Sequence, residues 1–399
     1  MFPASAATPD TVQWNEAGLQ RTARWRSERA APPPKQVVLA DDTLAADAAY
    51  RLANEGTALL WRGDFQNARH LLQALARRVD RRQRRPARPV PDAEPGGAFH
   101  RQRLAQASRA RVLGALLIEL QADYGIALRR GPDWRLAITE AWGAPPADVA
   151  DAAGSWVLSL RELLGLVSAH EWRKNGVPVA ALGAPPHNRI HPHYGVFSPV
   201  RGEYLQLVAD APLPAMLAAG GTAFDIGTGT GVLAAVLARR GLEVVATDTD
   251  SRALACAADN LARLGLAARV ELQPTDLFPA GRAALVVCNP PWLPARPGSP
   301  LERAVYDEDS RMLRGFLDGL AAHLAPGGEG WLILSDLAEH LGLRRRDELL
   351  HWIDQGGLQV RGRIDTHPVH PRAFDQSDPL HRARAAEITS LWRLAAQPV

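Results

Sequence analysis

From about residue 220 onward, short apolar runs alternate with segments whose apolar residues recur every three to four positions. The short runs indicate buried strands, and the longer spacing indicates helices that pack on a sheet. This alternation predicts a doubly wound, mostly parallel α/β sheet, whose ligand should lie beyond the carboxyl ends of the strands. Seven strands are expected, at residues 222–225, 242–247, 270–273, 284–288, 330–335, 360–365 and 388–394.

Helical spacing dominates the chain before about residue 175. Asp64 is placed to cap a helix, whose apolar positions would be Phe65, Ala68, Leu71, Leu72, Leu75 and Val79. Further helices are expected at residues 99–124, 133–142 and 156–170, and no strand is evident there. The pattern predicts an extended or loosely ordered arm at 1–40, an all-α domain at 41–175 and the sheet domain at 176–399.

Composition bears on the cellular setting. The net charge of +3 and the isoelectric point of about 9.1 permit a nucleic-acid or ribosome partner without requiring one. The basic residues are nearly all arginine, a bias that we attribute to GC-rich coding. Cys256 and Cys288 lie in apolar segments, so reduced core thiols are expected. No secretory signal or bilayer-spanning run is evident, so a cytoplasmic protein without a membrane partner is expected.

Acidic residues and glycines stand at the ends of the first three strands expected in the sheet domain. The turn after the first strand reads Asp-x-Gly-x-Gly-x-Gly, and its glycines let the backbone approach a ligand closely. It differs from the GxGxxG dinucleotide fingerprint because Val232 stands where the last glycine would be. The acid after the second strand is placed to accept hydrogen bonds from ribose hydroxyls. The acid after the third, with its apolar neighbour, could hold an adenine. The residues concerned are Asp225, Gly227, Thr228, Gly229, Gly231, Asp248, Asp276 and Leu277.

The fourth strand runs into a rigid turn that presents hydrogen-bond acceptors. Asn289 is followed by Pro290 and Pro291, whose φ angles are fixed and which have no N–H, and then by Trp292. The turn therefore holds the Asn289 amide and nearby backbone carbonyls beside an aromatic face. Such acceptors suit the protons of a planar –NH2 group, while the ring could stack on its plane. For these four residues alone, a proline-rich turn after a core strand is an equal alternative.

Taken in order, these segments resemble the motifs of class I S-adenosylmethionine-dependent methyltransferases. The Asn-Pro-Pro-aromatic form is similar to that of the amino-methyltransferases of protein glutamine, RNA bases and DNA adenine. The stretch with Phe197, Pro199, Arg201 and Glu203 also resembles one in the release-factor glutamine methyltransferases, although Val200 departs from that pattern. The resemblance covers about residues 190–399.

The resemblance implies a Rossmann-like methyltransferase sheet that binds S-adenosylmethionine. The turn from Asp225 to Gly231 would hold the methionine part of the cofactor, Asp248 the ribose, and Asp276 with Leu277 the adenine. The catalytic segment would be Asn289, Pro290, Pro291 and Trp292, with Asn289 also at the cofactor. Asn289 and the Pro290 carbonyl would take the substrate amine, and Trp292 would stack on it.

The methylated molecule stays open at this point. A glutamine side-chain amide of a translation-related protein is favoured, with an exocyclic base amine in ribosomal or transfer RNA as the alternative. Residues 41–175 would then be a substrate-recognition domain, and the oligomeric state is not predicted. A rival of another class is a noncatalytic RNA- or ribosome-binding module that keeps the fold. A nicotinamide-dependent oxidoreductase is a third possibility.

Several further residues are weaker candidates for a function. Phe197, Pro199, Arg201, Glu203 and His193 could line the mouth of the pocket or contact substrate. His187 and His191 lie near His193, but no cysteine or acid stands at ligand spacing, so no metal site is expected. The cluster Arg77–Arg88 could contact RNA phosphates or form a solvated helix end.

Overall fold

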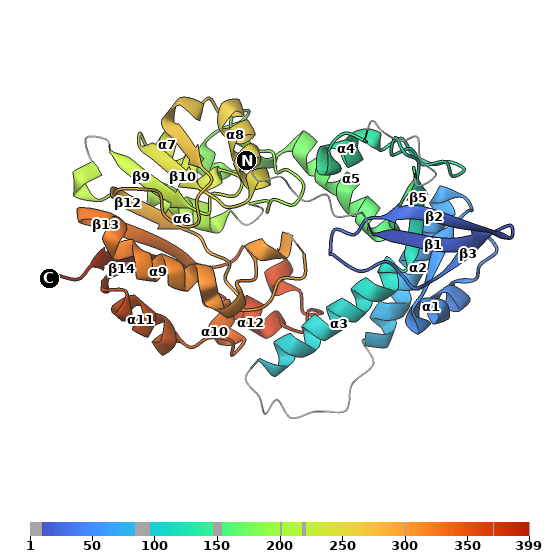
Figure 1. Cartoon of the computed structure of the whole chain (residues 1–399). Helices are drawn as coiled ribbons and strands as arrows, with labels where there is room; N and C mark the ends of the chain where they lie inside the picture. The colour runs from blue at the N-terminus through green and yellow to red at the C-terminus, as the bar shows by residue number, and fades with distance from the viewer. Residues whose placement is uncertain are drawn as a thin grey trace. The chain divides into compact units, whose positions relative to one another are not determined.

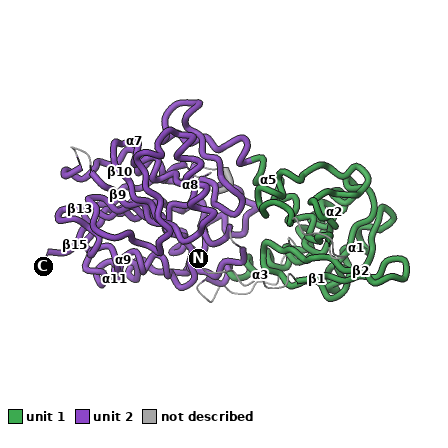
Figure 2. Tube along the Cα trace, turned by 45° about the horizontal axis from the view of Figure 1, so that its top comes forward, with its two compact units in different colours: residues 1–91, 100–171 green, residues 92–99, 172–399 purple. Residues whose placement is uncertain are grey.

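The computed structural model describes residues 10–83, 96–146, 154–199, 202–217, 221–299, 301–369 and 371–398. The chain divides into two compact units, residues 1–91 with 100–171 and residues 92–99 with 172–399 (Figure 2). The main part of the second unit begins at Trp172, close to the boundary expected at residue 176. Within the part of the chain that the structure describes, none of the helices has the length and apolar character needed to cross a bilayer.

The first unit is an α/β domain, so the expectation of an all-α domain is wrong. Its six strands form one sheet in the order β1-β2-β6-β5-β4-β3 (Figure 1). The strands are β1 (Thr11–Glu16), β2 (Leu19–Trp25), β3 (Gln36–Ala40), β4 (Thr57–Trp61), β5 (Leu116–Leu120) and β6 (Trp156–Ser159). The helices are α1 (Ala46–Glu55), α2 (Phe65–Gln83), α3 (Gly97–Gly114), α4 (Arg135–Trp142) and α5 (Leu160–Asn175). The described residues before 41, expected to form an arm, supply three of these strands.

The missed strands have a common physical cause. Each of β4, β5 and β6 is a short apolar run, and only one of their positions is not buried. A helix ends two residues before β5, and β6 continues into α5 without a break. Spacing cannot separate such a run from another turn of buried helix. Pairing decides, because β4 is hydrogen-bonded between β3 and β5, and β5 between β4 and β6.

The capped helix after Asp64 is confirmed. Helix α2 begins at Phe65 and buries all six apolar residues expected on its inner side. The Asp64 carboxylate accepts the N–H of Gln66 at 2.9 Å, as a residue at a helix N-terminus should. Asp64 is itself fully buried, and it is held by two hydrogen bonds from Arg130 at 2.6 and 2.8 Å.

The second unit contains the predicted seven-stranded sheet, in the order β11-β10-β9-β12-β13-β15-β14 (Figure 1). The strands are β9 (Thr222–Ile226), β10 (Glu243–Thr247), β11 (Val270–Gln273), β12 (Ala283–Cys288), β13 (Leu324–Ser335), β14 (Leu358–Thr366) and β15 (Thr389–Ala396). Strands β11, β10, β9, β12 and β13 are parallel to one another, and β15 is antiparallel to both of its neighbours. The order along the sheet reverses between β9 and β12, which is where such a sheet binds its ligand.

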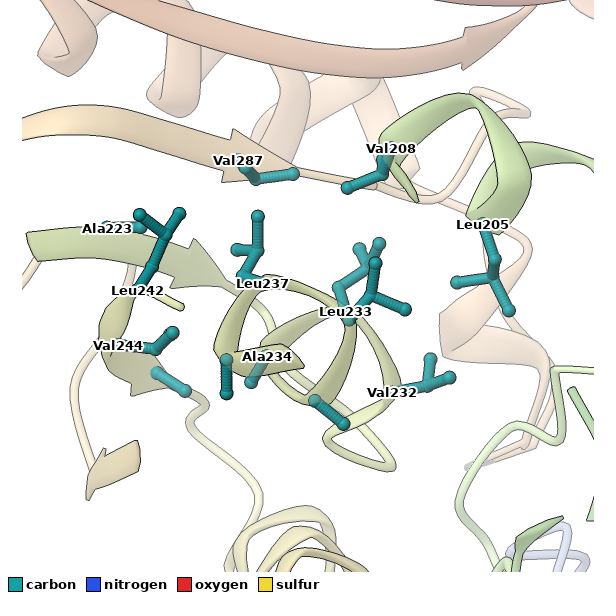
Figure 3. Close-up of a cluster of buried hydrophobic side chains, with 14 of the residues drawn as sticks. Leu205, Val208, Ala223, Val232, Leu233, Ala234, Leu237, Leu242, Val244 and Val287 are labelled. Atoms are coloured by element: carbon teal, nitrogen blue, oxygen red, sulfur yellow. The ribbon is translucent and has the colours of Figure 1, made fainter. Parts of the chain in front are cut away.

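Helices cover both faces of this sheet, as a doubly wound fold requires. The helices of this unit are α6 (Glu203–Asp210), α7 (Val232–Arg239), α8 (Ser251–Arg263), α9 (Arg311–His323), α10 (Leu337–His340), α11 (Arg346–Gln355) and α12 (His381–Ala386). A small hairpin of β7 (Val177–Pro178) and β8 (Arg189–Ile190) precedes them. On one face, Leu205 of α6 and Leu237 of α7 pack with Val287 of β12 (Figure 3). On the other face, α9 and α11 pack against the sheet.

Successive side chains of β12 point to opposite faces of the sheet. Val287 belongs to the cluster with α7, whereas its neighbour Cys288 belongs to the cluster with α9. Cys256 and Cys288 are both buried and free, which confirms that they are core thiols. Burial raises the pKa of Cys256 to about 11, so this thiol stays protonated near neutral pH.

Candidate functional site

The four strands that carry the predicted motifs are neighbours, and their carboxyl ends are level. Ile226 of β9 pairs with Thr247 of β10 and with Cys288 of β12. Thr247 pairs in turn with Gln273 of β11. Neighbouring strands lie about 4.8 Å apart. The residues that follow these four positions therefore meet at one edge of the sheet, at the point where the strand order reverses.

The turn after β9 is built from glycines with positive φ angles. Gly227, Gly229 and Gly231 have φ values of 74°, 55° and 78°. The N–H groups of Gly227 and Thr228 both donate to the carbonyl of Thr247, at 2.9 and 2.8 Å, which ties the turn to β10. No heavy atom lies within 4 Å of the position that a Cβ would take at Gly229. The backbone there is open, as the close approach of a ligand would require.

Asp225 is the fourth residue of β9, and its carboxylate is fully buried. Its Oδ2 accepts the hydroxyl of Thr228 at 2.6 Å and the N–H of Ala234 at 3.0 Å. Its Oδ1 is buried without a hydrogen-bond partner. Burial raises the pKa of Asp225 to about 6. A cationic donor would stabilise this buried, unpaired oxygen most, because it would supply the missing hydrogen bond and also compensate the negative charge.

Asp248 follows β10 and is joined directly to the glycine turn. Its Oδ2 accepts the N–H of Gly229 at 3.0 Å, and its Oδ1 accepts the N–H of Asp250 at 2.9 Å. The side chain is half-buried, and burial raises its pKa. Each carboxylate oxygen can accept more than one hydrogen bond. Asp248 can therefore hold the turn and still accept from a ligand's hydroxyl groups.

Asp276 and Leu277 follow β11, and the structure ties them to β10. The carbonyl of Leu277 accepts the hydroxyl of Thr247 at 2.6 Å, and Leu277 has a φ of 60°. The Leu277 side chain packs against the core that α9 covers. The Asp276 side chain is 67% exposed and lies 3.6 Å from Arg311. The pair thus offers one apolar surface and one acceptor at the outer side of the site.

The segment after β12 holds its amide in one orientation. The indole Nε1–H of Trp292 donates to Asn289 Oδ1 at 2.9 Å. The Trp292 ring meets Tyr204 in a T-shaped contact, with centroids 6.5 Å apart and an interplanar angle of 86°. Pro290 is buried, and Pro291 is half-buried. Trp292 therefore turns its N–H edge toward the amide, and stacking of its ring on a substrate stays a prediction.

The residues expected at a pocket mouth lie in different surroundings. Phe197 is 42% exposed, whereas Pro199 is buried. Arg201 lies outside the described residues. Glu203 is the first residue of α6 and accepts the N–H of Val369 at 2.8 Å. Of these residues, Phe197 is the one that presents a large apolar surface to solvent.

His193 lies against α8. Its Nε2 is 2.9 Å from Asp259 Oδ2, and its backbone N–H donates to the sulfur of Cys256 at 3.3 Å. His191 is held on the same side, where its backbone N–H donates to Asn260 at 2.7 Å. Among the described residues, no group of three or more histidine, cysteine, aspartate or glutamate side chains is arranged to hold a metal ion.

Two residues of the site, Tyr204 and Met312, were not predicted from the sequence. Tyr204 is buried and contacts Trp292, although it stands directly after Glu203 in a stretch already identified. Burial raises the pKa of Tyr204, and the Asn289 side chain partly offsets this rise. Met312 of α9 is close to the glycine turn, because a Cβ at Gly227 would lie 2.4 Å from its Cε. No local sequence signal identifies Met312, since its position depends on the packing of α9.

Asp307, in the acidic run after residue 306, caps a helix. Asp307 is buried and accepts the N–H groups of Met312 and Leu313 at 3.0 and 3.1 Å. Burial raises the pKa of Asp307. These bonds anchor the first turn of α9 and so fix Met312 beside the glycine turn.

Comparisons with known proteins find similarity to methyltransferases. Residues 188–345 match the family model of the methyltransferase small domain. The release factor glutamine methyltransferase of Cereibacter sphaeroides is 37% identical over 122 residues, which cover 27% of this chain and 44% of that protein. The enzyme of the same name from Moorella thermoacetica is 36% identical over 154 residues, which cover 32% of this chain and 54% of that protein.

A ribosomal RNA enzyme matches the chain at a similar level of identity. The ribosomal RNA small subunit methyltransferase C of Alcanivorax borkumensis is 32% identical over 148 residues, which cover 37% of this chain and 39% of that protein. The chain thus spans about half the length, or less, of these curated relatives. Over residues 188–345, the chain is therefore similar to proteins that contain the methyltransferase small domain.

Proposed function

We propose that the chain is an S-adenosylmethionine-dependent N-methyltransferase that acts on a planar amino nitrogen. One observation carries the proposal: four adjacent strands end at the same level, and a motif segment lies at each of these ends. Three of these segments bring a carboxylate, and the fourth brings an amide whose orientation is held by a hydrogen bond. An extended ligand along the first three segments would end beside the fourth.

The residues present fit this cofactor. Asp225 Oδ1, buried without a partner, could accept the ammonium group of the methionine part. The open backbone at Gly229 leaves room for the same part. Asp248 would accept from the ribose hydroxyls, while Leu277 would contact the adenine ring and Asp276 would accept from its amino group. When bound, S-adenosylmethionine supplies an electrophilic methyl group on a cationic sulfur.

Asn289 and the Pro290 carbonyl would hold the nitrogen to be methylated. An amide or aniline-like nitrogen is a poor nucleophile, because its lone pair is delocalised. Two hydrogen bonds from –NH2 to fixed acceptors favour a pyramidal nitrogen, which frees the lone pair. Proximity and electrostatic placement then supply most of the rate enhancement. A strong base is not required before transfer, because the proton leaves once the nitrogen has become cationic.

A glutamine side-chain amide of a translation-related protein is the substrate that we favour. The stretch from Phe197 to Glu203 supports it, through its similarity to the release-factor glutamine methyltransferases. Two of the matched relatives also carry that name. Such a substrate would place the chain in the cytoplasm and would make the first unit its recognition domain.

An exocyclic amine of ribosomal or transfer RNA is a second candidate, which the distribution of charge favours. The first unit holds 23 lysines and arginines against 17 acidic residues, whereas the second holds 23 against 26. On α2, Arg77, Arg81 and Arg82 are exposed. Arg77 and Arg81 are four residues apart and so share one face of the helix. Arg78, also on α2, forms a salt bridge with Asp47 at 2.7 Å, and Arg84, Arg85 and Arg88 lie outside the described residues.

Transfer of a labelled methyl group distinguishes the two substrate classes. The full chain is incubated with tritiated S-adenosylmethionine and an extract of cells that lack it, and the protein and RNA fractions are counted separately. Label in protein supports the glutamine amide, and label in RNA supports the base amine. Arg77→Glu with Arg81→Glu should lower RNA labelling about tenfold or more, because phosphate contacts dominate such affinity. The control Arg21→Glu with Lys35→Glu changes the net charge equally at other exposed sites.

The rival functions predict other results. Binding of RNA with no transfer to either fraction would support a noncatalytic module. Tight binding of NAD with no binding of S-adenosylmethionine, measured by calorimetry, would support an oxidoreductase and would contradict our proposal.

A further inference from the structure

The side chain of Trp292 is placed to set the orientation of the Asn289 amide. Its Nε1 lies 2.9 Å from Asn289 Oδ1, across a turn of two prolines. The ring is itself held in place, because Tyr204 meets it at 86° and the core clusters on both faces of the sheet pack against it. The indole N–H is therefore a fixed donor aimed at one atom of the amide.

The chemistry of the three side chains shows which of them decides the orientation. An indole N–H can only donate, so it can face only the oxygen of the amide. The Tyr204 hydroxyl, whose pKa the Asn289 side chain lowers, can donate or accept and would tolerate either end of the amide. With the oxygen held by Trp292, the –NH2 end is left for Tyr204. Trp292 therefore selects the orientation, and Tyr204 accommodates it.

We propose that Trp292 is a positioning residue, which keeps Asn289 Oδ1 available as an acceptor for the substrate nitrogen. This inference rests on the proposed N-methyltransferase function. A carbonyl oxygen has two lone pairs, so Oδ1 can bond to the indole N–H and accept a substrate N–H as well. A flipped amide would turn its own –NH2 group toward the substrate –NH2 group. Two donors would then face each other, and the substrate nitrogen would not be held.

The Asn289→Asp substitution separates this role from stacking. A carboxylate has two equivalent oxygens, so it offers an acceptor in either orientation and needs no Trp292 N–H to select one. Trp292→Phe keeps an aromatic face and removes the donor. Rates of tritiated methyl transfer into the extract are measured for the two single variants, the double variant and the wild type. Cofactor affinity and melting temperature serve as controls for the fold.

The expected result is a coupling between the two residues. With Asn289 present, Trp292→Phe should lower the maximal rate about fivefold, the factor that corresponds to one neutral hydrogen bond. The extract concentration at half-saturation should not change. In the Asn289→Asp background, Trp292→Phe should cause no further loss. Any one of four results would overturn the proposal. Two concern the rate: an equal loss in both backgrounds, or an unchanged rate in Trp292→Phe alone. The other two are a raised half-saturation point and a parallel loss of cofactor affinity.

A second measurement tests the hydrogen bond without any turnover. The indole proton of Trp292 is identified among those of the eleven tryptophans by the loss of its NMR signal in Trp292→Phe. In Asn289→Asp this signal should move downfield, because a carboxylate is the stronger acceptor. An unmoved signal would overturn the proposal. If the wild type transfers no methyl group while the signal does move, the proposed function fails and the contact still stands.

Discussion

Replacement of Asp225 by asparagine should separate the stability of the fold from its capacity to bind the cofactor. The buried carboxylate of Asp225 uses Oδ2 for two hydrogen bonds and leaves Oδ1 without a partner. Asparagine has the same size, and its single oxygen can keep the bonds from Thr228 and Ala234. Its –NH2 group would then occupy the place of Oδ1 and could not accept the donor of a cofactor. The variant also no longer buries an ionisable group.

The magnitude follows from the pKa of Asp225, which burial raises from 3.8 to about 6. The native protein binds this proton more tightly than the unfolded chain, so the contribution to stability is complete only below about pH 4. It is lost as the pH rises toward 6, and the loss is about 3 kcal/mol in total, because each tenfold difference in proton affinity is worth about 1.4 kcal/mol. Between about pH 4.5 and about pH 7.5 the loss is about 2 kcal/mol.

Chemical unfolding at these two pH values measures the effect. The free energy of unfolding of Asp225→Asn, relative to the wild type, should rise by about 2 kcal/mol from the lower to the higher pH. Calorimetry near pH 7.5 should show that the affinity for S-adenosylmethionine falls by about tenfold or more, as for the loss of one charged hydrogen bond. Asp210→Asn, at an exposed carboxylate of α6, is the matched control. A difference in stability that does not change with pH, or an unchanged affinity, would refute the reasoning.

Two further substitutions test the rest of the cofactor site. Gly227→Ala places a Cβ 2.4 Å from Met312 Cε at a φ of 74°, whereas the control Gly241→Ala has a φ of 88° and no heavy atom within 4 Å. Both substitutions should destabilise the fold by about 1 kcal/mol. Only Gly227→Ala should lower the affinity for the cofactor, measured by calorimetry. Equal affinities of the two variants would contradict this prediction. Asp248→Ala should lower the affinity for the cofactor about tenfold or more. It removes the hydrogen bond that holds the glycine turn and also the acceptor for the ribose hydroxyls. Asp250→Ala, which removes the cap of α8, should lower the melting temperature and leave the affinity unchanged; the reverse pattern would contradict the ribose assignment.

The sheet of the second unit could be predicted from the sequence because its signals are local and consistent. Strands such as β9, β10 and β12 are short runs rich in apolar residues, and the ends of β9, β10, β11 and β12 each carry a residue with its own chemistry. The parallel register then brings those ends together, as between Cys288 and Ile226. Long segments with clear periodicity, such as α2, were predictable for the same reason.

The sheet of the first unit could not be predicted, because the information that defines it is not local. The run Leu116–Leu120 has the composition of a buried strand and also of a buried helical turn. Its pairing with β4 and β6 decides, and β6 lies about forty residues away in the sequence. The contact of Tyr204 with Trp292 could not be predicted for the same reason, since the two residues come from distant parts of the chain.

The identity of the methylated atom tests the central claim most directly. The product of transfer by the wild type is digested, and the labelled fragment is examined by mass spectrometry, with Asn289→Ala as the matched control. The account predicts a methyl group on a planar amino nitrogen, of a glutamine amide or a base. It also predicts that Asn289→Ala binds S-adenosylmethionine and transfers almost none of its methyl group. A methyl group on carbon or on a hydroxyl oxygen, or undiminished transfer by Asn289→Ala, would contradict the account.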